Sequence, residues 1–90
     1  MTDRRYSMDE LTQELVTVVQ STLTKLKILQ SKQASGATFP DWAPEIYIEA
    51  QSITKRINEG LENKDISVQE LIKLYSEKDR LLDRLLFSVI

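Results

Sequence analysis

Two pairs of carboxylates lie four residues apart in stretches with helical periodicity, Asp79 with Asp83 and Glu45 with Glu49. This spacing places both carboxylates of a pair on one face of a helix, where they could bridge a hard cation. Carboxylates placed in this way are usually solvated, and the chain lacks the Glu-x-x-His pattern of di-iron helical bundles. We therefore expect no metal site and no cofactor.

The chain has no histidine and no cysteine. Their absence removes the usual proton shuttle near neutral pH, the thiolate nucleophile and the commonest ligands of transition metals. We therefore expect no catalytic residues and a protein that is not an enzyme. A small helical enzyme that uses charged residues only is an alternative, because such groups can stabilise a transition state inside a bundle. That alternative predicts an enclosed pocket lined by Lys78, Asp79 or Lys25.

Lys78 and Asp79 form the charged pair nearest the centre of a predicted apolar helical face. Two interpretations are open for this pair. It either sets the register of the helix where that helix packs, or its side chains reach solvent at the margin of the apolar face. We interpret Lys78 and Asp79 as candidate register or specificity residues.

Basic side chains do not gather into a surface for nucleic acid. The chain has 12 Lys and Arg against 14 Asp and Glu, for a net charge of −2. Acidic neighbours dilute both basic groups, Arg4 with Arg5 and Lys25 with Lys27 and Lys32. A nucleic-acid-associated regulatory protein is therefore only an alternative, and it predicts salt-sensitive retention on DNA or RNA.

The elements that carry these residues are predicted to be long helices. A content of 41% apolar and 29% charged residues, with two Gly and two Pro, favours helices over strands or disorder. At the start of the last helix, Ser67 can accept a hydrogen bond from an amide of the first turn, and Glu70 can reach back to the Ser67 amide. Apolar residues then recur at steps of three and four, which predicts a helix over about 67–89.

The same capping pattern recurs at Ser7, after a polar tail at residues 1–6 that we expect to be frayed. A stripe of apolar residues follows at helical spacing: Leu11, Leu15, Val18, Val19, Leu23, Leu26 and Leu29. This stripe predicts a first helix over about 8–33. Ile28 lies well off it.

Residues 34–41 hold a glycine and a proline and connect the first helix to the second. Asp41 is expected to cap a helix over about 42–62, whose seam is Ile46, Ala50, Ile53, Ile57 and Leu61. Gly60 either ends this helix or lies within it. The aromatic residues of the connection, Phe39 and Trp42, either fold back over the end of the core or anchor a ligand or partner.

These patterns predict an all-α fold in which residues 1–90 form a single domain. Its architecture is an antiparallel three-helix bundle with coiled-coil-like packing, which could also form a helical dimer. The last helix has a wider apolar arc than one bundle stripe requires, and the arc is either buried within the monomer or part of an interface. We predict a partner-binding surface made of Leu74, Leu81, Leu85, Phe87 and Ile28.

The expected function is that of a small non-enzymatic protein–protein interaction module, an adaptor, assembly factor or regulator. Its partner is expected to be another protein or a second copy, as a homodimer. The longest apolar runs fall far short of the ~20 residues that span a bilayer, and no apolar segment follows the N-terminal arginines. We therefore expect no membrane span and a cytoplasmic protein.

Overall fold

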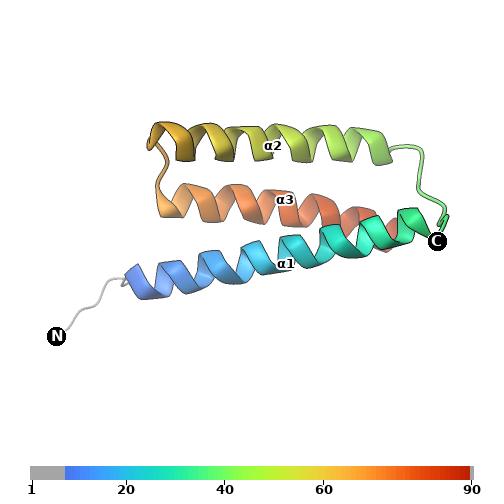
Figure 1. Cartoon of the computed structure of the whole chain (residues 1–90), viewed down its shortest axis with the longest axis horizontal. Helices are drawn as coiled ribbons and strands as arrows, with labels where there is room; N and C mark the ends of the chain where they lie inside the picture. Colours follow the sequence, from blue (N-terminus) through green and yellow to red (C-terminus); the bar gives the residue numbers. More distant parts are fainter. Residues whose placement is uncertain (1–7, 90) are drawn as a thin grey trace.

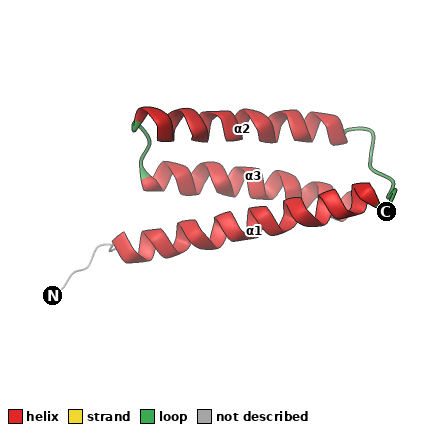
Figure 2. Ribbon diagram, in the orientation of Figure 1, coloured by secondary structure: helices red, strands yellow, loops and turns green. Residues whose placement is uncertain are grey.

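Three helices make up the computed structural model of this chain, which describes residues 8–89. They are α1 (Met8–Ala34), α2 (Ala43–Asn63) and α3 (Val68–Ser88), as Figures 1 and 2 show. The described part is 84% helical and contains no strand. Each helix begins and ends within one residue of its predicted range. The predicted tail at residues 1–6 and the predicted cap at Ser7 lie outside the described residues.

The helices form an up-down-up bundle in which α3 lies between the other two (Figure 1). Both α1 and α2 pack on α3, whereas no Cα atom of α1 lies within 8 Å of a Cα atom of α2. The bundle is accordingly flattened, with extents of 27 and 17 Å along its two shorter axes. Figure 1 shows α1 running obliquely, so that its N-terminal half is the part farthest from α2.

The core lies at the end where α1 finishes and α2 begins. Its buried residues come from all three helices: Leu29 of α1, Ala43 and Ile46 of α2, and Leu82 and Leu85 of α3. Phe39 and Trp42 pack against this core, so the aromatic residues of the connection cover its end. The guanidinium of Arg84 also lies 5.1 Å from the centre of the Trp42 ring, a cation–π distance.

The cap of α3 confirms the sequence pattern in part. The hydroxyl of Ser67 accepts a hydrogen bond of 3.0 Å from the amide of Glu70. The Glu70 carboxylate differs from expectation, because it accepts a 3.1 Å hydrogen bond from Arg56 of α2 rather than from the Ser67 amide. A charged donor on the neighbouring helix offers this carboxylate a stronger partner than a backbone amide does.

The start of α2 corrects the prediction that Asp41 caps the helix. Trp42 occupies the N-cap position and makes no capping hydrogen bond with its side chain. The packing of the Trp42 ring against the core and beneath Arg84 positions the chain where it enters the helix. Pro44 lies in the first turn, where a missing amide proton costs little.

The end of α2 decides between the two interpretations of Gly60. The helix continues through Gly60 to Asn63, and Lys64 takes the left-handed conformation with φ of 58°. Gly60 is needed for a close approach instead, since a Cβ atom there would lie 2.7 Å from the Cβ atom of Ile66. The short connection from α2 to α3 therefore crosses directly over a position that has no side chain.

Candidate functional site

The broad apolar arc of α3 is explained by its central place in the bundle. One side of the arc packs toward α2, where Leu81 lies beside Ile53 and Leu85 lies in the core. The opposite side faces α1, where Asp79 makes its contacts. Between them, Lys78 and Leu82 face a groove that separates α1 from α2. A helix with neighbours on two sides needs a wider apolar arc than a helix with one neighbour.

This arrangement corrects the prediction that Leu85 belongs to a partner-binding surface. Leu85 is 0% exposed, because it fills the core between the helices. Leu81 is half-buried and packs against the same core, and Leu74 is half-buried as well. Ile28 is exposed, and Phe87 is 83% exposed near the end of α3. A partner-binding role for Leu74, Leu81, Phe87 and Ile28 stays a prediction.

Asp79 joins α3 to α1 through a polar cluster. Its carboxylate accepts hydrogen bonds of 2.8 Å from the Ser21 hydroxyl and 2.7 Å from the Lys25 ammonium. The hydroxyl of Thr22, a buried residue, lies 3.3 Å from the same carboxylate and 2.8 Å from the Val18 carbonyl oxygen. These contacts fix the height of α3 along α1, which supports the interpretation of Asp79 as a register residue.

The charges of the polar cluster stabilise each other. Burial alone would raise the pKa of Asp79, but the hydrogen bonds from Lys25 and Ser21 outweigh it, so that the pKa is lowered from its ordinary value. Burial alone would likewise lower the pKa of Lys25, but the hydrogen bond to Asp79 and the charges of Asp79 and Asp83 raise it. The Lys25 ammonium lies 3.4 Å from the Asp83 carboxylate. Both partners are therefore held in their charged forms.

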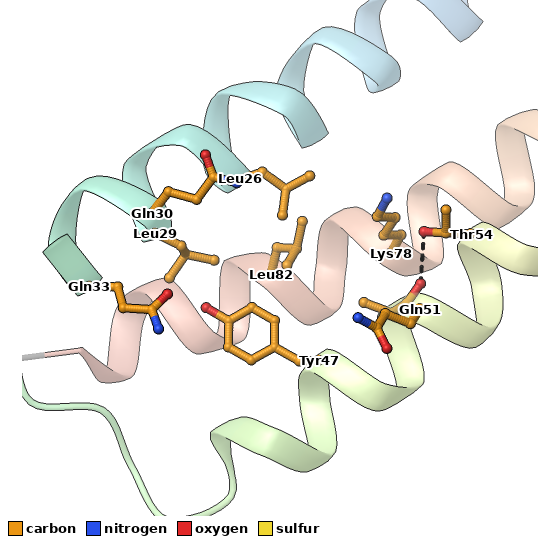
Figure 3. Close-up of a pocket in the computed structure, with 10 residues that line it drawn as sticks. Leu26, Leu29, Gln30, Gln33, Tyr47, Gln51, Thr54, Lys78 and Leu82 are labelled. Carbon is orange, nitrogen blue, oxygen red and sulfur yellow. Dashed lines mark hydrogen bonds between the residues drawn. The ribbon is translucent and has the colours of Figure 1, made fainter.

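Lys78 lies on the other side of α3 and has a different environment (Figure 3). Its ammonium points into the space between α1 and α2, and it makes no ion pair or hydrogen bond with any residue that the structure describes. Desolvation by burial lowers its pKa from the ordinary value. Lys78 and Asp79 therefore do not act as a pair, although they are adjacent in the sequence. Asp79 joins the bundle internally, and Lys78 is left facing the groove.

We call this hollow the open groove and define it by the residues that line it. They are Leu26, Leu29, Gln30 and Gln33 of α1, Tyr47, Ala50, Gln51 and Thr54 of α2, and Lys78 and Leu82 of α3. Its volume is about 250 Å³. A second hollow of about 690 Å³ lies beside it, and both are lined by Gln33, Tyr47 and Gln51. The open groove combines an apolar floor with amide side chains along its edges and one cation.

The N-terminal half of α1 extends the apolar wall of the open groove. Residues seven positions before Leu26, Gln30 and Gln33 lie on the same face of α1 as these three residues. Together they form a seam along the helix. We call it the α1 seam, and it consists of Thr12, Val16, Val19, Leu23, Leu26 and Gln30. Val16 is 46% and Leu23 is 52% exposed. On α2, Leu61 lies seven residues after Thr54, faces the same way and is also exposed.

The apolar stripe predicted for α1 combines two faces of the helix. Leu11, Leu15, Val18, Thr22, Lys25 and Leu29 recur at steps of four and three toward α3, and the α1 seam recurs at the same steps one residue later. The signal for a second face was the width of the stripe, because Val19 and Leu23 lie to one side of Leu11 and Leu29. In the structure the first face packs on α3, whereas Val16 and Leu23 of the second face are about half exposed.

The side chains that line the open groove offer three kinds of noncovalent contact. Lys78 can attract an anion, the glutamine amides can donate and accept hydrogen bonds, and the leucines can bury apolar surface. Lys25 and Asp79 are bound to each other on the other side of α3, so they do not join Lys78 in the open groove. Residues 8–89 contain no group of three or more acidic, His or Cys side chains placed to hold a metal ion.

No family model, curated protein or solved structure matches this chain. None of the helices within residues 8–89 is both long and apolar enough to cross a membrane.

Proposed function

We propose that this protein is a non-enzymatic protein–protein interaction module that receives an amphipathic helix of a partner protein in its open groove. The observation that carries the proposal is the α1 seam, an apolar helical face that α2 and α3 cover only in part. Val16 and Leu23 leave about half of their surface exposed there, and Leu61 of α2 is exposed to a similar extent. Monomeric proteins rarely leave such contiguous apolar surface without a partner.

A helix is the element that fits this surface best. The apolar side chains of the α1 seam recur at steps of four and three, which is the spacing that a facing helix meets in a coiled coil. The floor of α3 and the wall of α2 would contact the same helix, so that the three-helix layer becomes a four-helix bundle. The gain in buried apolar area at all three walls is the source of affinity.

A second copy of this chain is a less suitable occupant of the open groove. If a second copy docked through its own α1 seam, it would bring a face that contains no carboxylate between Thr12 and Gln30. Two seams in contact would therefore cover Lys78 without offering it a counter-charge. A homodimer stays a possible assembly through another surface, and a different protein is the proposed partner in the open groove.

Two of the described basic residues are already paired with carboxylates, which weakens the nucleic-acid alternative. Lys25 is engaged by Asp79 and Asp83, and Arg56 is engaged by Asp65 and Glu70. Arg4 and Arg5 lie outside the described residues.

The experiment is affinity capture from the native cell with three forms of the protein, followed by calorimetry with the partner that is identified. The doubly substituted form Val16→Ser with Leu23→Ser removes exposed apolar surface from the α1 seam. Ile48→Ser is the matched control, because Ile48 is an exposed apolar residue that does not line the open groove. We expect at least tenfold weaker binding by the seam variant and unchanged binding by the control, with helicity of both checked by circular dichroism. Equal binding by all three forms, or no retained partner, would contradict the proposal.

A further inference from the structure

The geometry points to a specific requirement on the partner: its helix carries one carboxylate within its apolar face, and this carboxylate pairs with Lys78. This inference rests on the proposed function, since it names the chemistry of the helix that the open groove receives. The observation behind it is that, within residues 8–89, Lys78 is an unpaired cation in the floor of a groove that no acidic residue lines.

The carboxylates near Lys78 either pair with another residue or lie on another side of α3. Asp79 and Asp83 both face Lys25 at the contact of α3 with α1. Glu49 of α2 and Glu77 of α3 lie with Leu81 on the opposite side of α3 from α1. On α1, the groove is lined by Leu26, Leu29 and two glutamines, which carry no charge. The described residues 8–89 therefore supply Lys78 with no counter-ion.

Covering Lys78 with a purely apolar helix is unfavourable. An ammonium group loses hydration when it is removed from water, and this loss is recovered only if a charged or polar partner replaces the water. The lowered pKa of Lys78 shows that part of this desolvation has already occurred in the free protein. A carboxylate on the partner would restore the lost interaction in a setting where a charge-assisted hydrogen bond is stronger than at an open surface.

The remaining walls define the rest of the partner helix. The α1 seam runs from Thr12 to Gln30, and a helix that follows it is about 27 Å long at ~1.5 Å per residue, which corresponds to about 18 residues. Its apolar residues recur at steps of three and four, and the carboxylate lies among them at the height of Lys78. Gln30, Gln33 and Gln51 at the edges can hydrogen-bond to polar residues that flank the apolar face.

The test uses a display library of 18-residue amphipathic helices with leucine at the apolar positions. One central apolar position at a time is opened to Glu, Asp, Gln, Asn, Lys and Leu, and binders are selected on the wild-type protein. We expect enrichment of Glu or Asp over Gln, Asn and Lys. The selected Glu peptide is then synthesised beside its Gln counterpart, and we expect about tenfold weaker binding of the Gln peptide by fluorescence anisotropy.

Substitutions in the protein assign the effect to Lys78. Lys78→Gln should remove the preference for the Glu peptide, and Lys78→Glu should reverse it in favour of a peptide with Lys at that position. Lys73→Gln is the matched control, since Lys73 is an exposed lysine of the same helix and does not line the open groove. Its preference should equal that of the wild type.

The outcomes separate this inference from the proposed function. Peptides that bind in the open groove equally well with Glu, Gln or Leu, with weaker binding by the Val16→Ser and Leu23→Ser form, would overturn the Lys78 requirement and leave the interaction module standing. A preference for Glu that persists in Lys78→Gln would also overturn it. Selection of no helix whose binding depends on the α1 seam would overturn both.

Discussion

Asp79 is the residue on which the polar contact between α1 and α3 depends. It accepts hydrogen bonds from Ser21 and Lys25, and its side chain is 20% exposed. The neighbouring Asp83 also faces Lys25, at 3.4 Å, but its side chain is 45% exposed. Pairs that water reaches contribute little to stability, whereas loss of a charge that several donors hold costs more. The two aspartates therefore form an internal comparison within one cluster.

Replacing Asp79 with asparagine is expected to lower the free energy of unfolding by about 1 to 2 kcal/mol, because the charge that Lys25 and Ser21 face is lost. Asp83→Asn is expected to cost less than about 0.5 kcal/mol, since that pair is longer and more exposed. Urea unfolding followed by circular dichroism measures both values. Equal losses in the two variants would argue against Asp79 as the register residue.

The pKa shifts of the same cluster predict how stability depends on pH. The pKa of Asp79 is lower in the folded protein than its ordinary value of 3.8, so the unfolded chain binds the proton more readily. The stabilisation is therefore present above about pH 4 and is lost as the pH falls below that value. The pKa of Lys25 is raised above 10.5, so its contribution is present below about pH 10.5 and is lost as the pH rises further.

Unfolding measurements from pH 2 to pH 7 should show this effect as a difference between two proteins. The wild type is expected to lose more stability on acidification than Asp79→Asn, which has no carboxylate to protonate at that position. The difference between them should be constant from about pH 5 to pH 7 and shrink below about pH 4. Parallel curves over the whole range would show that Asp79 does not have a lowered pKa.

At the scale of the helix, two residues of one predicted surface differ in burial because α3 lies between the other two helices. Leu85 is 0% and Phe87 is 83% exposed, although they are two positions apart. Leu85→Ala is expected to lower the free energy of unfolding by about 2 to 5 kcal/mol, because it leaves a cavity in the core. Phe87→Ala should change it by less than about 0.5 kcal/mol. Thermal or urea unfolding distinguishes them, and a small loss for Leu85→Ala would contradict its place in the core.

Gly60 connects the end of α2 with the start of α3 by close approach. Alanine in the interior of a helix normally stabilises by about 0.5 to 1 kcal/mol relative to glycine. Here the alanine Cβ atom would lie 2.7 Å from the Cβ atom of Ile66. Any residue other than glycine at position 66 has a Cβ atom, so the contact is not relieved by a change of side-chain rotamer. Gly60→Ala is therefore expected to destabilise by roughly 1 to 3 kcal/mol, as overpacked sites do.

The neighbouring exposed residue Glu59 supplies the control for Gly60, since Glu59→Ala changes the same turn of the helix without meeting Ile66. Its effect on the urea midpoint should be close to zero. A gain in stability from Gly60→Ala would show that the connection can move away from the helix.

The helices themselves could be predicted because their signals are local. Ser67 caps its helix, and apolar spacing of three and four residues continues to the predicted ends. The order of the helices across the bundle could not be predicted, because a wide apolar arc is compatible with a central helix and with an interface. The α1 seam was read as part of the core stripe for the same reason. Lys78 and Asp79 were identified together, but periodicity did not reveal that they face different neighbours.

At the scale of the whole molecule, the buried cluster that joins all three helices lies at one end of the bundle, and the N-terminal half of α1 lies at the other. Leu29, near the end of α1, is buried against α2 and α3, whereas Val16 and Leu23 are exposed in the stretch that runs away from α2. Helical segments with few buried neighbours open locally at a lower free energy than those in the core. The two halves of α1 should therefore differ in stability although they form one continuous helix.

Amide hydrogen exchange by NMR measures this difference directly. We expect amides at residues 12–18 to exchange at least tenfold faster than those at residues 25–31, because Leu29 in the second stretch is buried in the core whereas Val16 in the first is exposed. A partner helix in the open groove would contact the α1 seam along its length, so its binding should slow exchange in the first stretch more than in the second. Uniform protection along α1 in the free protein would mean that its N-terminal half is as stable as its C-terminal half. The N-terminal half of the α1 seam would then not be a weakly supported stretch that a partner helix stabilises.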